Sequence, residues 1–408
     1  MTSRRPSAGT IALGALVVGL GLGAIPSLHD TALALEPVGT LWVNALRMTV
    51  IPLIVSLLIV GVVSAASSKD VGKLGLRAFG LFLLLLTAAA VFTALIAPFA
   101  FRFLPVDPAA SATLRAGAQL QPVTQDLSFT GWLLSLIPAN PIKAVADGAM
   151  LPILVFTLAF AFALAKLEPN VKQAPLKVFE SVSQAMLVIV KWVLAAAPVG
   201  VFALAFALAT KLGSDTAAMA LGYYVGLVIV LHVITGAGVY LLAVVGGRVP
   251  LARFARAVFP AQVVAFTSRS SLAALPALVE GARDQLKLPA DITGFVIPFA
   301  VSAFKLTSPI YWTLGAMCVG RIYGIELAPT QLATIALASI LLNAATPGIP
   351  SGGLLIQAPL YAQVGLPVEA LGILIAIDTI PDMFKTTLNV TADMGVAVIL
   401  GRRSGGGI

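Results

Sequence analysis

The chain has 408 residues, of which 59% are hydrophobic and only 10% are charged, and its formal net charge is +8. Soluble domains carry about 25% charged residues, so this composition excludes a water-soluble protein of this size. Many apolar runs exceed roughly 18 residues, which is enough to span a bilayer as a helix and too long for a barrel strand. The sequence therefore predicts an all-α polytopic membrane protein that does not bind nucleic acid, with its basic excess in cytoplasmic loops.

The residues that most often bind metals or form disulfides are scarce. A single cysteine, Cys318, excludes a disulfide framework, and the two histidines, His29 and His232, lie far apart in the sequence. We expect no cofactor and no metal-ligating cluster of the zinc type.

Six apolar segments suited to spanning helices occupy the first part of the chain, at 8–28, 38–66, 74–100, 128–166, 180–210 and 216–246. The pair Arg4-Arg5 resembles the start of a signal peptide, but no convincing cleavage site follows, so we interpret 8–28 as the first span. Pro138 and Pro141 predict that the fourth segment is broken. The polar segment 101–127 is expected to be a surface loop.

The pattern changes after residue 250. Two apolar stretches are interrupted by small polar residues, Gly and Pro, which indicates re-entrant helical hairpins at 255–286 and 328–361. Each is followed by a spanning segment, 291–320 and 367–400. We therefore expect eight transmembrane helices plus two hairpins, arranged as inverted repeats, which is the pattern that marks a transporter binding site.

The basic residues set the orientation. If the eight spans alternate, most Lys and Arg of the loops fall on the side that holds both termini. By the positive-inside rule, the termini of this multi-pass protein lie on the cytoplasmic side of the cell (inner) membrane.

The last spanning segment carries a polar face. At about 100° per residue, six polar residues lie within an arc of roughly 100°: Asp378, Asp382, Lys385, Thr386, Asn389 and Asp393. Each ionisable group at the bilayer centre costs about 2.5–3.5 kcal/mol, so the face needs internal partners or a ligand. We interpret it as a binding face; the alternative is a structural cluster of ion pairs between helices.

The two hairpin tips offer complementary groups. Ser270 and Ser271 provide hydroxyls beside a half-helix N-terminus that attracts carboxylates, and Arg269 adds a planar guanidinium. The alternative is a helix cap with a snorkelling arginine. The second tip, Gly348–Gly353, permits close backbone approach and is interpreted as a gate, the alternative being a flexible loop at the interface.

These residues resemble the dicarboxylate/amino acid:cation symporter family, the glutamate transporters and their bacterial homologues, over nearly the whole chain. The family pattern D-x-x-x-D-M-x-R-T-x-x-N-V-x-G-D is similar to 378–393, with Lys385 for Arg and Ala392 for Gly. The serine-rich tip with its following L-P resembles Thr267–Pro276, and the G-V-P-G-x-G tip resembles 348–353. Asn140-Pro141 through Ile153 resembles the family's fourth segment.

The resemblance implies a homotrimer in which a transport part moves as an elevator against a scaffold. The implied parts are scaffold helices 1–2 (1–73), transport helix 3 and its loop (74–127), scaffold helices 4–5 (128–212) and a transport core (213–408). The implied substrate-binding residues are Arg269, Ser270, Ser271, Ile349, Ser351, Gly353, Asp382, Lys385, Thr386 and Asn389. Asp382 matches the position that holds an amino group, which dicarboxylate-specialised members tend to lack, and Lys385 matches the arginine that binds a side-chain carboxylate.

The chain departs from the family at the sodium ligands. Where the family has N-M-D-G-T, this chain has Phe304-Lys305-Leu306-Thr307-Ser308, and the third span has Phe82, Leu85 and Leu86 where the family places hydroxyls. Hard cations need oxygen ligands, which Phe and Leu do not supply. Asn389 and Asp393 are the remnants of a degenerate sodium site, so no bound metal is expected.

Charge balance leads to a hypothesis about Lys305. The family core sets four aspartates against two arginines, whereas this chain sets three aspartates (Asp378, Asp382, Asp393) against three cations (Arg269, Lys305, Lys385). Lys305, near Asp393 or Asp382, would stand in for sodium or exchange protons, with Asp378 and Asp393 in the same cluster. The alternative is a lysine at a lipid or water boundary in a degenerate homologue.

The sequence thus predicts a secondary transporter, a symporter or exchanger of acidic amino acids (glutamate or aspartate), with weak or lost sodium dependence and possible proton coupling. Alternatives of the same fold transport C4-dicarboxylates or small neutral amino acids. Alternatives of other classes are an intramembrane hydrolase that pairs Ser270 or Ser271 with Lys305, and a non-transporting or anion-conducting protein.

Overall fold

The computed structural model describes residues 8–66, 72–104, 106, 108–118, 134–346 and 352–403, and every regular element among them is helical. The first half contains α1 (Ala8–Gly23), η1 (Pro26–Leu28), α2 (His29–Ala66), α3 (Gly72–Ala100), η3 (Phe101–Phe103), α4 (Pro108–Gly117), α6 (Pro141–Ala146), α7 (Met150–Ala165), α8 (Pro169–Ala195) and α9 (Ala197–Leu212).

The second half is divided into shorter pieces. It contains α10 (Ser214–Val245), α11 (Leu251–Ser268), α12 (Ser271–Glu280), η4 (Gly281–Gln285), η5 (Ile292–Val296), α13 (Ile297–Ala303), α14 (Ser308–Ile322), α15 (Pro329–Leu341), η6 (Asn343–Ala345), α16 (Gly352–Leu355), α17 (Ala358–Gln363), α18 (Ala370–Ile377) and α19 (Thr379–Arg403).

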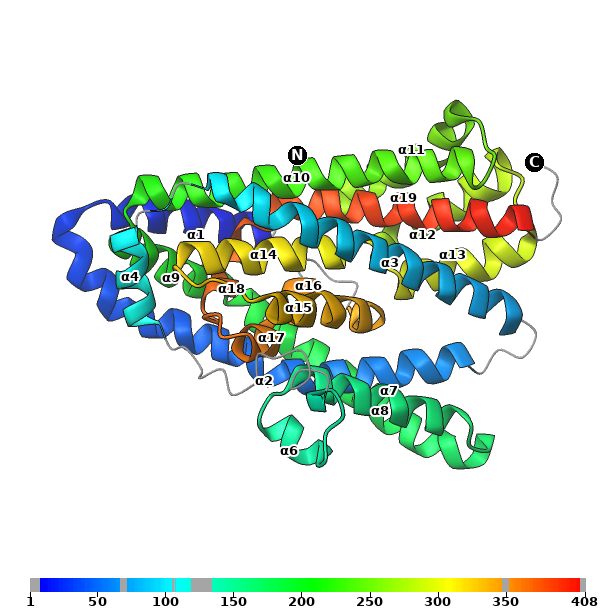
Figure 1. Cartoon of the computed structure of the whole chain (residues 1–408), viewed down its shortest axis with the longest axis horizontal. Helices are drawn as coiled ribbons and strands as arrows, with labels where there is room; N and C mark the ends of the chain where they lie inside the picture. Colours follow the sequence, from blue (N-terminus) through cyan, green and yellow to red (C-terminus); the bar gives the residue numbers. More distant parts are fainter. Residues whose placement is uncertain are drawn as a thin grey trace, which may run out of the picture.

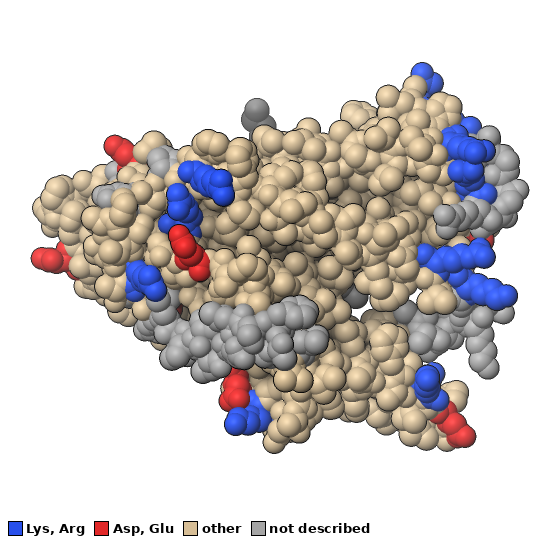
Figure 2. All heavy atoms as spheres, in the orientation of Figure 1, with Lys and Arg blue, Asp and Glu red and all other residues tan. Residues whose placement is uncertain are grey.

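Several of these helices suit a bilayer. By length and composition, five helical stretches of the described residues are long and apolar enough to cross a membrane: Pro26–Val63, Lys73–Phe103, Pro169–Ala195, Asp215–Val245 and Ile292–Ile322. On the face shown in Figure 2, most charged side chains lie toward the two ends of the long axis, with a wide uncharged belt between them. The molecule is a multi-pass membrane protein; the arrangement of eight spans stays a prediction.

The helices pack in two groups. Helices α1, α2, α8 and α9 contact one another, and α2 also packs on α7. In the second group α10 and α11 pack on α19, while α14 packs on α3, α10 and α15. Figure 1 shows α10 and α19 side by side along the long axis of the molecule. The polar face of α19 is thereby surrounded by protein, with Asp393 completely buried.

The predicted breaks around residues 138 and 268 are present. Asn140 caps the short helix α6, its Oδ1 accepting a hydrogen bond of 3.0 Å from the Lys143 N–H, and α7 begins only at Met150. Between α11 and α12 the chain turns at Arg269, whose left-handed backbone (φ 54°, ψ 33°) ends α11. Helices α11 and α12 pack against each other as a hairpin.

Two predictions for the first half were wrong in detail. The supposed loop 101–127 contains helix α4, because Leu114 supplies a buried apolar contact that anchors it. The segment 180–210 is not one helix: α8 ends at Ala195 and α9 starts at Ala197. Pro198, in the first turn of α9, has no N–H to continue the hydrogen-bond ladder of α8.

Two spans of the second half, expected as single helices, are also interrupted. Residues 291–320 break at Phe304–Thr307, where Phe304 is extended (φ −119°, ψ 112°). The segment 367–400 breaks at Asp378 between α18 and α19, because Pro381 cannot donate to the carbonyl four residues earlier. Both breaks place backbone groups in the protein interior that need partners other than their own helix.

The close approach of α11 and η4 gives a testable prediction. A Cβ on Gly281 would collide with the Ala257 carbonyl oxygen of α11. We expect Gly281→Ala to destabilise the protein by about 1–3 kcal/mol through overpacking, measured as a lower Tm in detergent. Gly226→Ala in α10 is the control, because its Cβ would meet nothing within 4 Å. Equal Tm values for Gly281→Ala and the wild type would contradict the packing described here.

Candidate functional site

The predicted polar residues converge on one small cavity of about 50 Å³. Its walls come from the α11–α12 turn, the break before α14, the second hairpin and the polar face of α19. Of the predicted residues, it is lined by Arg269, Ser270, Ser271, Lys305, Gly353, Asp382, Lys385, Thr386 and Asn389. Ile349 and Ser351 lie outside the described residues. A larger cavity of about 330 Å³, which contains the Lys211–Glu36 ion pair, involves none of these residues.

The N-terminus of α12 forms one wall. The Ser270 hydroxyl accepts a hydrogen bond of 3.3 Å from the Ala273 N–H, so Ser270 caps α12 as well as lining the cavity. Ser271, at the first helical position, is buried. The unpaired N–H groups of a helix N-terminus and its positive dipole end suit a carboxylate. Arg269, half-buried in the turn, adds a guanidinium to the same wall.

A buried ion cluster at the start of α19 contributes Asp382 and Lys385 to the lining. The Lys385 ammonium lies 2.6 Å from Asp378 Oδ1 and 3.4 Å from Asp382 Oδ1. It also lies 4.3 Å from the centre of the Tyr311 ring, a cation–π contact. Asp382 Oδ2 has no hydrogen-bond partner among the described residues. The cluster thus combines a fixed ammonium with a carboxylate oxygen that a ligand can still engage.

Lys305 lies in the break between α13 and α14 and is 7% exposed. Its ammonium donates a hydrogen bond to the Val301 carbonyl oxygen. Among the described residues it forms no ion pair with Asp382 or Asp393, the two partners that the sequence suggested. Asp393 is fully buried, and neither of its carboxylate oxygens accepts a hydrogen bond from the part of the chain that the structure describes.

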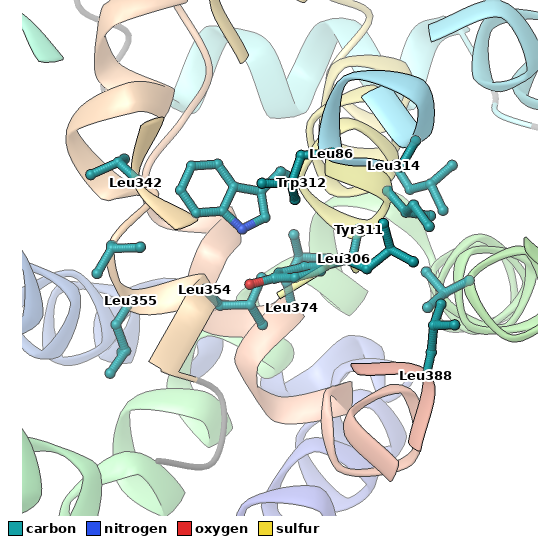
Figure 3. Close-up of a cluster of buried hydrophobic side chains, with 14 of the residues drawn as sticks. Leu86, Leu306, Tyr311, Trp312, Leu314, Leu342, Leu354, Leu355, Leu374 and Leu388 are labelled. Atoms are coloured by element: carbon teal, nitrogen blue, oxygen red, sulfur yellow. The ribbon is translucent and has the colours of Figure 1, made fainter. Parts of the chain in front are cut away.

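Asn343 and Tyr311 are site residues that the sequence analysis missed. The Asn343 side chain accepts from the Lys305 N–H (2.7 Å) and donates to the Lys305 carbonyl (2.8 Å), so it replaces helical bonds lost at the break. The Tyr311 hydroxyl points toward the segment that carries Leu354 (Figure 3), and lies close to Gly353. The sequence did contain a signal for Asn343: it is a polar amide within the apolar run 330–345, and a buried amide needs hydrogen-bond partners.

The remaining polar contact joins α19 to the break between α13 and α14. Asn389 Oδ1 accepts a hydrogen bond of 3.2 Å from the Thr307 N–H. Thr386 lines the cavity one turn earlier on α19. Asn389 therefore holds the backbone of the broken helix and also lines the cavity.

At the positions where the family has sodium ligands, this chain carries hydrocarbon side chains. Phe82 of α3 stacks on Phe304 with ring centres 4.6 Å apart, and Leu85 and Leu306 line one apolar cavity of about 340 Å³. Leu86 is buried as well. These side chains offer no oxygen to a hard cation, so they do not fit a sodium ion at this position.

The comparisons with known proteins agree with this geometry. The model of the sodium:dicarboxylate symporter family matches residues 10–403. The proton/sodium-glutamate symport protein of Bacillus subtilis (strain 168) is 29% identical, over 96% of this chain and 92% of the relative. The proton/glutamate-aspartate symporter of Escherichia coli (strain K12) is 26% identical, over 95% and 91%. The C4-dicarboxylate transport protein of Laribacter hongkongensis (strain HLHK9) is 25% identical, over 95% and 87%.

These proteins are transporters and not enzymes, which removes the hydrolase alternative for this chain. The ammonium of Lys305 is hydrogen-bonded to a carbonyl rather than to a serine, in keeping with that conclusion. The cavity, its two polar walls and the match along the whole length lead to one assignment: the chain belongs to the sodium:dicarboxylate symporter family.

Proposed function

We propose that this transporter carries acidic amino acids, glutamate or aspartate, with weak or no dependence on sodium. The observation that carries the proposal is that one cavity is lined by the N-terminus of α12 and Arg269 as well as by Asp382 and Lys385. An acidic amino acid has two carboxylates and one ammonium, and this cavity offers two groups for anions and one for a cation. The names of the glutamate and glutamate-aspartate relatives support the same substrate class.

Each group has a proposed role. The α-carboxylate binds the first turn of α12 through Ser270 and Ser271, with Arg269 close by. The substrate ammonium binds Asp382, and the side-chain carboxylate binds Lys385, which Asp378 holds in place at 2.6 Å. Thr386 and Asn389 supply polar contacts, and Gly353, Ile349 and Ser351 belong to the second hairpin, which closes over the substrate as a gate.

The larger architecture follows the family resemblance. We propose a homotrimer in the inner membrane, with eight spans, two re-entrant hairpins and both termini in the cytoplasm. The scaffold would comprise 1–73 and 128–212, and the mobile part 74–127 and 213–408. The packing of α1, α2, α8 and α9 together, and of α10, α11 and α19 together, supports this division.

A C4-dicarboxylate is the second candidate substrate. Three cationic side chains, Arg269, Lys305 and Lys385, line the cavity together with a single carboxylate, Asp382. That excess of positive charge favours a dianion, and the relative from Laribacter hongkongensis is named for C4-dicarboxylate transport. Asp382 decides between the candidates, because a carboxylate beside the substrate favours the ammonium of an amino acid, which a C4-dicarboxylate lacks.

Uptake into proteoliposomes tests the proposed function. We expect counterflow of labelled glutamate or aspartate in sodium-free choline buffer, at a rate similar to that in sodium buffer, and weaker counterflow of succinate. Repeating the assay across pH measures proton coupling. A strict requirement for sodium, or conductance without counterflow, would contradict the proposal.

Asp382→Asn separates the two substrate classes. Removing the carboxylate leaves the substrate ammonium without its partner, and truncating one partner of a buried charge pair costs about 2–5 kcal/mol. We expect calorimetric affinity for glutamate or aspartate to fall by about thirtyfold or more, and affinity for succinate to be retained or to rise. Asp291→Asn, in the N-cap before η5, is the control. Equal losses for amino acid and succinate would contradict the assigned role of Asp382.

Gly353→Ala tests the gate. An added Cβ would collide with the Tyr311 hydroxyl, so the second hairpin could not approach α14. We expect substrate affinity to fall by about tenfold or more, which corresponds to roughly 1–3 kcal/mol of overpacking. Tyr311→Phe in the same chain removes the hydroxyl and should restore part of the affinity. Normal affinity of the single variant would show that closure does not depend on this contact.

A further inference from the structure

A second cavity, of about 330 Å³, is separate from the substrate cavity. Helix α2 contributes Glu36 and Thr40 to its lining, and α9 contributes Lys211. Tyr323, directly after α14, and Glu369, directly before α18, line it as well. The volume lies within the range of small-molecule sites, roughly 300–1,000 Å³. None of these residues has a role in the function proposed above.

Most of the lining of this second cavity is hydrocarbon. The large apolar side chains that face it are Leu33, Leu41, Leu114, Leu204, Leu208 and Ile373. Apolar surface of a ligand is stabilised when such a wall removes it from water, whereas a small inorganic ion gains nothing from it. The wall therefore suits a ligand that has an apolar body.

The charged groups of the lining carry a net negative charge. The Lys211 ammonium lies 2.6 and 2.8 Å from the two carboxylate oxygens of Glu36, so these two charges neutralise each other. Glu369 adds a second carboxylate, which gives the lining a formal charge of −1. This charge favours a cationic ligand and disfavours an anionic one.

The Tyr323 hydroxyl can bind the same cationic group. Tyr323 is only 8% exposed, and none of the hydrogen bonds that the described residues form involves its hydroxyl. A buried hydroxyl without a partner is costly, and a ligand N–H would satisfy it. Arg115 and Arg321 line a neighbouring cavity that Tyr323 also borders, so anions are drawn to that side of Tyr323 rather than to this one.

We infer that this cavity is a binding site for a small organic amine. The ligand's ammonium binds the Glu369 carboxylate and the Tyr323 hydroxyl, and its apolar body packs against the leucines of α2 and α9. A primary amine fits better than a quaternary ammonium, because a quaternary ammonium has no N–H to donate to Tyr323.

The position of the site gives the bound amine an effect on transport. Glu36 and Lys211 belong to the proposed scaffold, and Tyr323 and Glu369 belong to the proposed mobile part. An amine that contacts both parts holds them in one arrangement and slows transport without competing for the substrate cavity. This effect rests on the proposed function, whereas the binding of the amine does not.

Calorimetric titration of the purified protein in detergent tests the binding. The probes are phenethylamine, its neutral analogue phenethyl alcohol and the anion phenylacetate, in sodium chloride buffer because choline is itself an organic cation. We expect one phenethylamine to bind per chain, at least about tenfold more tightly than either analogue. Equal affinity for the amine and the alcohol, or no binding of the amine, would overturn the inference.

Three variants locate the amine. Glu369→Gln should lower the affinity for phenethylamine to that for the alcohol, whereas Glu326→Gln, an exposed carboxylate outside the cavity, should leave it unchanged. If Glu369→Gln folds poorly, Tyr323→Phe removes only the hydroxyl and should lower amine affinity by about tenfold. Ala118→Leu adds bulk to the lining and should weaken both amine and alcohol. Unchanged amine affinity in Glu369→Gln, in Tyr323→Phe or in Ala118→Leu would contradict the assigned position.

Counterflow in proteoliposomes tests the effect on transport. Saturating phenethylamine should lower the maximal rate of glutamate counterflow and leave its half-saturating concentration unchanged, and Glu369→Gln should abolish this inhibition. Competition between amine and glutamate would contradict an effect from a separate site. Absence of glutamate counterflow without the amine would count against the proposed function alone, because the titrations do not depend on the substrate.

Discussion

The structure depends on the burial of several ionisable side chains around α19. Lys385 pairs with Asp378 and Asp382 in the interior around α19, and Lys305 and Asp393 are buried in the same region. Removing one partner from a buried pair costs about 3–5 kcal/mol, so each charge constrains its neighbours. Buried ionisable groups need polar partners. The breaks in the helices, the Asn343 contacts to the Lys305 backbone and the small polar cavity all lie around these groups.

The interrupted helices give the cavity its chemistry. The breaks at Arg269, Phe304–Thr307 and Asp378 turn helix ends toward the interior, where their backbone groups meet side chains or a ligand. One end presents N–H groups beside Ser270, and another presents the Val301 carbonyl to Lys305. The same fold thus offers hydrogen-bond donors at one helix end and an acceptor at another.

Much of this could be predicted from the sequence. The excess of apolar residues determines the helical membrane class, and the spacing of Asp382, Lys385 and Asn389 puts them on one face of a helix. The convergence of the α11–α12 turn with that face followed from the resemblance. The departure from the family's sodium-ligand pattern, with its change in charge balance, drew attention to Lys305.

Other features depend on tertiary contacts that no local pattern encodes. The break at Phe304 is maintained by Asn343, which lies 38 residues further along the chain. Helix α4 forms because Leu114 finds a buried contact, although its segment looks like a loop. In the sequence, nothing distinguishes Tyr311 from other aromatic residues. In the structure, α14 places its ring against the Lys385 ammonium and its hydroxyl close to Gly353.

An electron cryo-microscopy structure of the purified protein with aspartate in sodium-free buffer tests the account most directly. The account predicts aspartate between the first turn of α12 and Asp382, with the Lys305 ammonium on the Val301 carbonyl. Aspartate absent without sodium would contradict it.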